Sequence, residues 1–277
     1  MTDATPSLEI DTALARRVLT GFLRSETRRV GFARGVVGVS GGLDSALTCF
    51  LAAEALGPRN VLALRLPHAD SSPDSLEDAA EVIRLTGVRE HTFALTDMAA
   101  PLLATIAPKD KVRRGNVLAR LRMIVLYDHS ASFGGLVLGT SNKTEILLGY
   151  TTLFGDAASA INPLGDLYKT QVRQLARAVG VPEHIVAKPP TADLWPGQTD
   201  EGELGVTYDE VDRLLYLLVD ERRTPEACIE AGFRAALVRR TIERIRRNHY
   251  KRVPPVIAKL SRRTVGYDFL YYRDDGS

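Results

Sequence analysis

The sequence predicts an α/β protein with a doubly wound parallel sheet, helices on both faces of that sheet, and a helical C-terminal part. Two observations support this prediction. Short β-rich runs alternate with longer helical patterns through the first two thirds of the chain. The β-rich runs are apolar at nearly every position, which is typical of strands buried on both faces in a parallel sheet of βαβ units.

Strands and helices are expected to alternate in a regular order. The strands are expected at residues 35–39, 61–66, 91–95 and 135–139, and the helices between them at 43–56, 75–85 and 116–133. Gly57-Pro58 and Gly87 close the first two of these helices, because glycine and proline end helical patterns. Ligands of such sheets bind outside the carboxyl ends of the strands. We therefore expect the functional site at that edge.

The chain from Tyr168 onward predicts helices and loops without a strong strand. Within it, residues 186–205 are rich in Pro, Gly and polar side chains, and we expect a mobile loop there. We expect one domain over residues 1–277, with an α/β core at about 35–165 and a helical extension at about 166–277. The basic segment 222–263 favours a solvated helical face, with phosphate binding as the alternative.

Composition excludes several classes of protein. The 277 residues are 45% hydrophobic and carry a net charge of only +2, which argues against a dedicated nucleic-acid binder. Cys49 and Cys228 are far apart, so they form neither a zinc motif nor a disulfide framework. No apolar stretch approaches the ~18 residues of a membrane span. Residues 1–11 lack the apolar core of a signal peptide, so we expect a cytoplasmic location and no membrane partner.

A glycine-rich segment, Ser40-Gly41-Gly42-Leu43-Asp44-Ser45, follows the first predicted strand and opens the next helix. Glycines let backbone amides approach phosphate oxygens, and a helix N-terminus favours anions. Asp44 would repel a phosphate unless Mg²⁺ lay between them, and carboxylate and phosphate oxygens suit that ion. The spacing matches neither a Walker A loop nor GxGxxG. The structural alternative is a glycine-rich turn in which Asp44 only favours the helix dipole.

This segment resembles the pyrophosphate-binding loop of the N-type ATP pyrophosphatases, which adenylylate a substrate and release pyrophosphate. Further motifs resemble those of the NAD synthetases within that superfamily. They occur in order as GNVLARLRM at 115–123, GTSNKTE at 139–145, NPLGDLYKTQV at 162–172, KPPTADLW at 188–195 and GQTDE at 197–201. The resemblance runs from about residue 35 to 255 and implies an adenine nucleotide alpha-hydrolase-like fold.

The resemblance also implies an activity. An ammonia-dependent NAD synthetase is a ligase that uses ATP to amidate deamido-NAD through an adenylylated intermediate, giving NAD, AMP and pyrophosphate. It implies Mg²⁺ as cofactor, a homodimer, and ammonia supplied from solution or by a separate glutaminase. Two alternatives stay open: an adenylating ATP pyrophosphatase with a different acceptor, and a non-catalytic nucleotide sensor.

The family match carries over to individual positions. It implies that ATP contacts Gly38, Val39, Ser40, Gly41, Gly42, Leu43, Asp44, Ser45, Thr140, Lys169 and Thr191. It implies Asp44 and Glu145 as Mg²⁺ ligands, and Ser40, Asp44, Asp156 and Lys169 as catalytic groups. It implies that Arg120, Tyr250 and Lys251 contact deamido-NAD.

Three positions depart from the family pattern on the acceptor side. Leu153 stands where relatives that bind deamido-NAD often carry Lys, and Ala160 stands where Asp is common. Tyr250 takes the position of the family's histidine, since His249 is displaced by one residue. These departures concern the dinucleotide contacts and leave the expected ATP site intact.

Overall fold

A computed structural model describes residues 7–69, 71–107, 110–191 and 199–264 of the chain. Its sheet has four parallel strands in the order β3-β2-β1-β4. The strands are β1 (Gly35–Gly38), β2 (Val61–Arg65), β3 (Arg89–Thr92) and β4 (Leu136–Val137). In β1, Val36 and Val37 are fully buried. The predicted parallel sheet is confirmed.

All four strands are shorter than predicted: β1 and β2 each end one residue earlier, and the other two differ more. The β3 strand was expected at residues 91–95, but it begins at Arg89 and all four of its residues are exposed. It lies at the edge of the sheet, where apolar content is a weak guide to pairing. The β4 strand has only two residues, and pairing continues beyond it through a bridge between Leu138 and Ile161.

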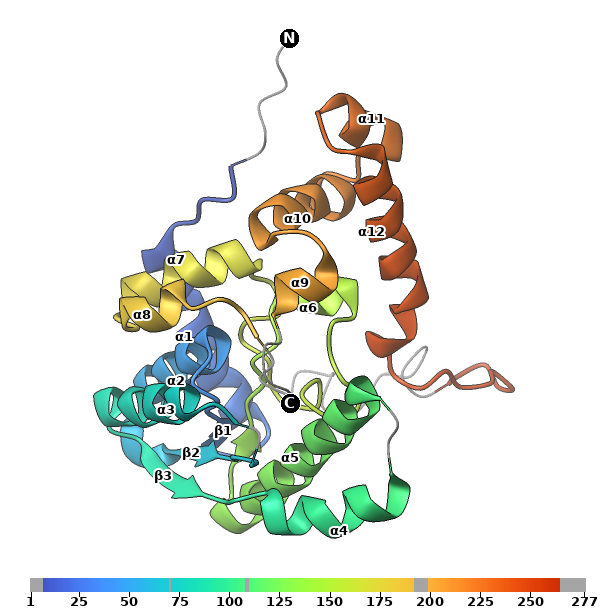
Figure 1. The fold of residues 1–277 in the computed structure, drawn as a ribbon. Helices are drawn as coiled ribbons and strands as arrows, with labels where there is room; N and C mark the ends of the chain where they lie inside the picture. Colours follow the sequence, from blue (N-terminus) through green and yellow to red (C-terminus); the bar gives the residue numbers. More distant parts are fainter. Residues whose placement is uncertain (1–6, 70, 108–109, 192–198, 265–277) are drawn as a thin grey trace.

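Helices cover both faces of the sheet, as Figure 1 shows. One face carries α1 (Thr12–Arg29), α2 (Leu43–Leu56), α3 (Pro73–Thr86) and α7 (Lys169–Val179). The other carries α4 (Thr96–Ile106) and α5 (Lys111–Phe133). The larger core cluster includes Leu23, Leu47 and Leu175 on the first face, and a separate cluster includes Leu95 and Leu118 on the second. The doubly wound architecture is therefore confirmed.

Local capping explains where the predicted helices differ. The α5 helix begins at Lys111 rather than at residue 116, because the Asp110 carboxylate accepts from the backbone N–H of Arg113. The α3 helix begins at Pro73, at a position where the missing N–H of proline has no cost. The α2 helix matches its prediction, since Gly57 stops it.

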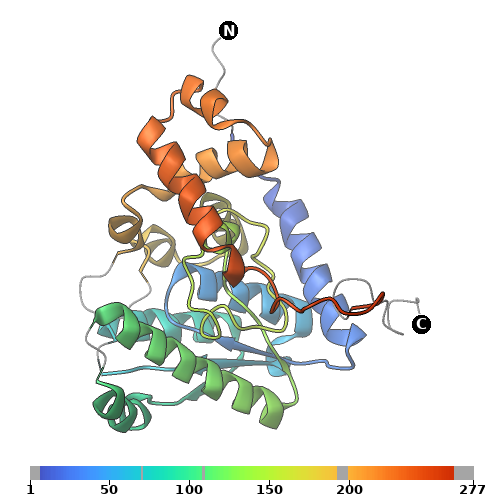
Figure 2. The same cartoon turned by 90° about the vertical axis from the view of Figure 1, so that its right-hand side faces the viewer.

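The C-terminal part is helical in its described residues. It contains α8 (Glu183–Ala187), α9 (Asp200–Leu204), α10 (Tyr208–Leu215), a π-helical turn (Tyr216–Asp220), α11 (Pro225–Glu230) and α12 (Ala235–Arg247), which a 3₁₀ turn (His249–Lys251) follows. Figure 2 shows α12 running toward the loops that follow the short helix α6 (Lys143–Leu148). Among the described residues, no helix is long and apolar enough to cross a membrane.

The expectation of one loop over residues 186–205 was wrong at both ends. The α8 helix extends to Ala187, and α9 occupies residues 200–204. The α9 helix forms because the Thr199 hydroxyl accepts from the backbone N–H of Gly202, which caps its first turn. Residues 192–198 lie outside the described residues.

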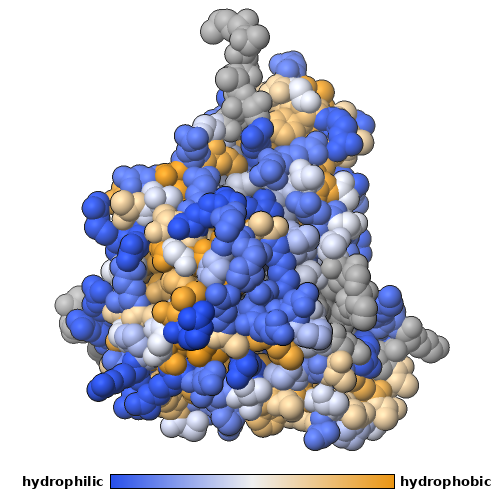
Figure 3. All heavy atoms as spheres, turned by 60° about the vertical axis from the view of Figure 1, so that its left-hand side comes forward, coloured by the Kyte–Doolittle hydropathy of each residue, from blue (hydrophilic) through white to orange (hydrophobic). Residues whose placement is uncertain are grey.

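The surface turned forward in Figure 3 is mixed in character. Hydrophilic side chains predominate there, and hydrophobic ones gather in small groups between them. Large apolar side chains that are exposed include Leu102 on α4 and Ile124 on α5.

Candidate active site

The loop after β1 is shaped by a close backbone approach. Gly41 has a φ of +82°, and a Cβ atom at this position would lie 2.1 Å from the carbonyl oxygen of Ser75 in α3. Only glycine fits both demands. The loop therefore rests directly on the first turn of α3, which fixes its path toward α2.

Two serine hydroxyls hold the same loop from within. The Ser45 hydroxyl accepts from the backbone N–H of Ser40 at 3.1 Å and donates to the carbonyl of Gly42 at 2.9 Å. The Ser40 hydroxyl accepts from the N–H of Gly42 at 3.3 Å. No side chain caps the start of α2, where Gly42 is the N-cap residue. The N–H groups of that first turn are therefore available to an anion.

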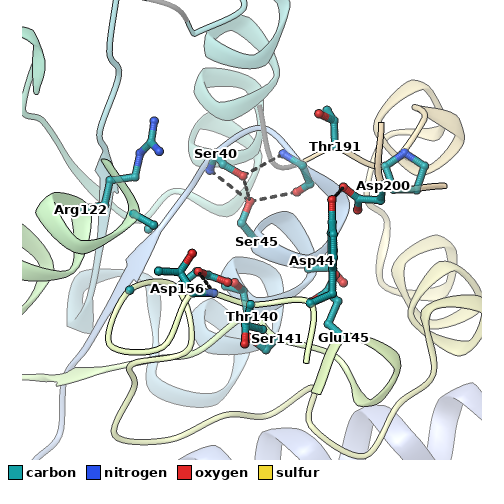
Figure 4. A pocket seen from close by; sticks show the side chains of 18 of the residues that line it. Ser40, Asp44, Ser45, Arg122, Thr140, Ser141, Glu145, Asp156, Thr191 and Asp200 are labelled. Atoms are coloured by element: carbon teal, nitrogen blue, oxygen red, sulfur yellow. Dashed lines mark hydrogen bonds between the residues drawn. The ribbon is translucent and has the colours of Figure 1, made fainter. Parts of the chain in front are cut away.

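A cavity of about 800 Å³ opens at the carboxyl ends of the strands. Every predicted ATP contact, from Gly38 through Ser45 together with Thr140, Lys169 and Thr191, lines it. Figure 4 shows Asp44, Glu145 and Asp200 gathered on one side and Arg122 on the other, with Ser40 and Ser45 between them. The volume suits a nucleotide-sized ligand.

A buried lysine lies between the two predicted metal ligands. The Lys169 ammonium forms ion pairs with Asp44 and, at 3.4 Å, with Glu145, and its side chain is only 4% exposed. Burial lowers the pKa of Lys169, but Asp44 and Glu145 outweigh that effect and raise it above its usual value. The lysine therefore remains a permanent cation in the cavity.

The Glu145 carboxylate is held in place by the start of its own helix. Asn142 and Glu145 form a capping box in α6, in which the Asn142 side chain accepts from the Glu145 N–H at 3.0 Å. Asn142 also donates to the Asp44 carboxylate at 3.0 Å, so it joins the two acids. Burial raises the pKa of Glu145 to about 8, and the nearby Asp44 carboxylate adds to this rise. A cation placed between these acids would oppose that shift.

The two acids fit a magnesium site that substrate completes. Among the described residues, no three His, Cys, Asp or Glu side chains form a group that could hold a metal alone. Mg²⁺ is commonly held by one or two carboxylates together with phosphate oxygens and water. Asp44 and Glu145 could supply the protein's share of that coordination.

A third acid, Asp200, was not recognised from the sequence. It lies in the first turn of α9, is 4% exposed, and lines the cavity. Its carboxylate accepts from the hydroxyls of Tyr150 at 3.2 Å and Tyr208 at 3.1 Å. Burial raises its pKa. The available signal was the GQTDE segment, but only the fold brings this acid beside Lys169.

Behind the cavity, the buried Asp212 of α10 joins two helices that carry site residues. Its carboxylate accepts from the Thr144 hydroxyl at 2.6 Å and from the Thr170 N–H at 2.8 Å. The Thr144 hydroxyl in turn accepts from the N–H of Lys169 at 3.1 Å. Burial raises the pKa of Asp212 to about 6. Asp212 thus sets the spacing between the starts of α6 and α7.

Asp156 lies across the cavity from this cluster. Its carboxylate accepts from the backbone N–H of Thr152 at 2.8 Å, and burial raises its pKa. The Thr152 hydroxyl donates to Asn116 of α5 at 2.8 Å. These contacts fix the loop after α6 against the long helix α5.

The predicted acceptor residues are separated by the fold. Lys251 lines the cavity, where its ammonium donates to the carbonyls of Gly149 at 2.7 Å and Thr151 at 2.8 Å. Arg120 and Tyr250 are exposed and are not among the described residues that line the cavity. Arg122, for which the sequence indicated no role, lines it instead and donates to the Leu66 carbonyl at 3.2 Å.

The end of α6 is capped by side chains from the C-terminal segment. Arg244 and Asn248 donate to the Leu148 carbonyl at 3.2 and 3.0 Å, and Arg252 donates to that of Leu147 at 2.8 Å. These groups satisfy carbonyls that a helix end leaves without partners. The basic segment is therefore more than a solvated face, since it docks α12 onto the site.

Comparisons with known proteins agree with this geometry. The family model described as NAD synthase matches residues 15–255. An NH(3)-dependent NAD(+) synthetase from Trichlorobacter lovleyi is 53% identical over 97% of this chain and 98% of its own.

Two solved structures share the fold. An NMN synthetase from Francisella tularensis has a TM-score of 0.80 and 33% identity, over 90% of this chain and 99% of its own. An NH3-dependent NAD synthetase from Campylobacter jejuni, in complex with the nitrate ion, has a TM-score of 0.78 and 29% identity, over 91% and 100%. With this agreement of motifs, fold and identity over nearly its full length, the chain belongs to the NAD synthase family.

Proposed function

We propose that this chain is the ligase that joins ammonia to deamido-NAD at the expense of ATP, giving NAD, AMP and pyrophosphate. The observation that carries the proposal is the convergence of Lys169, Asp44 and Glu145 beside the uncapped start of α2, within one cavity. The name of the Trichlorobacter lovleyi relative supports ammonia as the nitrogen donor.

The proposed reaction has two steps, and both place charge where this cavity can stabilise it. In the first, a carboxylate oxygen of deamido-NAD bonds to the α-phosphorus of ATP while the bond to the bridging oxygen of pyrophosphate breaks. Negative charge grows on the leaving pyrophosphate, where the amides at the start of α2 and the Lys169 ammonium would stabilise it.

In the second step, the nitrogen of ammonia bonds to the activated carbonyl carbon. The bond from that carbon to the phosphate oxygen breaks, AMP leaves, and the nitrogen loses a proton to water. Neither step needs a protein nucleophile. The cavity's contribution is to orient both nucleotides and to exclude competing water.

We propose Mg²⁺ as the cofactor, with Asp44 and Glu145 as its protein ligands. When bound, it would neutralise phosphate charge during the first step. Lys169 already pairs with both acids, so it would hold them in position whether or not the ion is bound.

The proposed ATP site comprises residues 38–45 with Thr140, Lys169 and Thr191, and the proposed catalytic groups are Ser40, Asp44, Asp156 and Lys169. For deamido-NAD we propose Lys251, which lines the cavity, together with Arg120 and Tyr250. Because Arg120 and Tyr250 lie outside the cavity of one chain, they would reach an acceptor only where another copy extends the site.

We further propose a homodimer, one domain over residues 1–277, and a cytoplasmic location. Exposed apolar side chains of α4 and α5, including Leu102, Ile106 and Ile124, offer a surface for a second copy. Ammonia would come from solution or from a separate glutaminase. Light scattering of the purified chain tests the dimer.

The decisive experiment is product analysis with ATP, Mg²⁺, ammonium and deamido-NAD. Formation of NAD and AMP in equal amounts supports the proposal. Nicotinate mononucleotide is the comparison acceptor, because the Francisella tularensis relative is named an NMN synthetase. Release of AMP with another acceptor alone would favour a different adenylating enzyme, and absence of AMP with every acceptor would favour a nucleotide sensor.

A further inference from the structure

A row of arginines on α12 faces the cavity. Arg240, Arg244 and Arg247 are spaced four and three residues apart, which places them on one face of the helix, and all three line the cavity. Lys251 continues the row in the 3₁₀ turn that follows. Glu243 also lines the cavity, but the row as a whole carries excess positive charge.

The row has hydrogen-bonding capacity beyond its structural contacts. Arg244 donates to the Leu148 carbonyl and lies over the Tyr150 ring at 5.6 Å, and Arg240 donates to the Gly205 carbonyl at 3.0 Å. The Arg247 side chain makes no hydrogen bond, ion pair or ring contact within the part of the chain that the structure describes. A guanidinium has five N–H donors, so most of them remain available for a ligand.

The phosphates of ATP do not account for this row. They already have the uncapped start of α2 and the buried Lys169, which belong to other elements of the fold. The proposed reaction brings a second polyanion, the acceptor dinucleotide, into the same cavity. The glycine-rich loop offers no second set of backbone N–H groups for the phosphates of that acceptor. Guanidinium groups bind phosphate oxygens in a bidentate manner, which suits this second ligand.

The length of the row indicates which kind of acceptor it fits. The seven residue steps from Arg240 to Arg247 span about 10 Å along the axis of the helix. A diphosphate that joins two nucleosides can contact two such arginines at once, whereas a single phosphate contacts one turn of the helix. We propose that the α12 row binds the diphosphate of a dinucleotide acceptor. This inference rests on the proposed function.

The test uses neighbouring arginines as matched controls. Arg246 and Arg239 lie on the same helix, are exposed, and are not among the described residues that line the cavity. Arg247→Ala should raise the KM for deamido-NAD about tenfold, the usual effect of losing one charged hydrogen bond. Arg246→Ala should leave that KM unchanged, and Arg247→Lys should restore part of the loss. The double variant Arg240→Ala, Arg247→Ala should raise the KM for deamido-NAD more than either single substitution does.

The same variants also test whether the row binds ATP instead, or binds every phosphorylated acceptor equally. The KM for nicotinate mononucleotide should rise less than that for deamido-NAD, and the KM for ATP should stay constant. The role of the row would be overturned if Arg246→Ala raised the KM for deamido-NAD as much as Arg247→Ala does, or if only the KM for ATP rose. It would also be overturned if Arg247→Ala raised the KM values for deamido-NAD and nicotinate mononucleotide equally. If the unmodified chain makes no NAD from deamido-NAD, both proposals fail. If the unmodified chain makes NAD from deamido-NAD but Arg247→Ala leaves the KM for deamido-NAD unchanged, only this inference fails. Circular dichroism of Arg247→Ala should match the unmodified chain.

Discussion

The two sides of the cavity are built in different ways. On the ATP side, one short stretch from Ser40 to Ser45 supplies the loop, its internal hydrogen bonds and the start of α2. On the acceptor side, the walls come from α5, the loop after α6, and α12, which are far apart in the sequence. A site built from contiguous residues can be recognised by its motif, whereas a site assembled from distant segments depends on how they dock.

The largest effect is expected on the ATP side. Asp44→Asn keeps the shape of the side chain but removes the charge that pairs with Lys169 and that would hold a cation. We expect ATP–pyrophosphate exchange in the presence of acceptor to fall about 100- to 1,000-fold, the range seen when one group that stabilises transition-state charge is lost. Circular dichroism should stay unchanged. Exchange near the native rate at low Mg²⁺ would contradict the metal-ligand role.

A smaller effect on the same side comes from the loop's shape. Gly41→Ala places a Cβ atom against the Ser75 carbonyl and strains a positive φ, so the loop must move. Strain of about 1–3 kcal/mol corresponds to a rise in the KM for ATP of up to about a hundredfold. Gly31→Ala is the control, since Gly31 has a φ of +81° but open space around its Cβ position. Steady-state kinetics should show a raised KM for ATP in Gly41→Ala but not in Gly31→Ala. An equal rise in both variants would mean that the positive φ, and not the contact with Ser75, causes the loss of ATP binding.

On the acceptor side, Lys251 is expected to matter both as a proposed contact for deamido-NAD and through the loop that it holds. Lys251→Ala leaves the carbonyls of Gly149 and Thr151 without their shared donor. We expect the KM for deamido-NAD to rise about tenfold, as for one charged hydrogen bond, and the KM for ATP to change much less. Arg252→Ala is the comparison, because Arg252 caps the Leu147 carbonyl and does not line the cavity in the described residues. A selective rise in the KM for ATP would reverse the assignment of the two sides.

The smallest effect tests how far the ATP side depends on tertiary contacts. Asp212→Asn keeps the volume of a buried side chain but can no longer accept from both Thr144 and Thr170. We expect kcat to fall a few-fold while the KM for deamido-NAD stays constant, because α6 and α7 would separate slightly. Asp212→Glu should not rescue kcat, because its longer side chain does not fit the same pair of donors. A loss of stability without any change in kcat would mean that Asp212 only supports the fold.

The same residue should make stability depend on pH. Because burial raises the pKa of Asp212 to about 6, the folded chain binds a proton that the unfolded chain releases near pH 4. The contribution of Asp212 to the free energy of unfolding should therefore fall as the pH rises from about 4 to 6. Asp212→Asn should remove that component, which denaturant titrations at pH 4, 5, 6 and 7 can measure. An identical pH profile in both proteins would show that Asp212 does not titrate in this window.

Sequence patterns located the core elements but not all of their limits. The α2 helix was predicted at its observed bounds, because a run of small apolar residues lies between two glycines. The α5 helix was predicted to begin later than it does, because its start depends on one capping hydrogen bond from Asp110. The α9 helix was missed altogether, since Thr199 and Gly202 are as typical of a loop as of a capped first turn.

Chemistry that lies within single segments could be predicted from the residues of those segments. The glycine-rich loop, the helix start that follows it and the placement of Asp44 there follow from local residue types, because backbone conformation and helix dipoles are local properties. Glu145 was assigned as the second acid only through the resemblance to the family. The packing of distant segments places Lys169 between those acids, brings Asp200 into the same cavity, and makes Arg122 rather than Arg120 line it. It also decided that the arginines of α12 face inward. These features depend on which helix face packs against the core, and that is set by contacts between residues that are distant in the sequence.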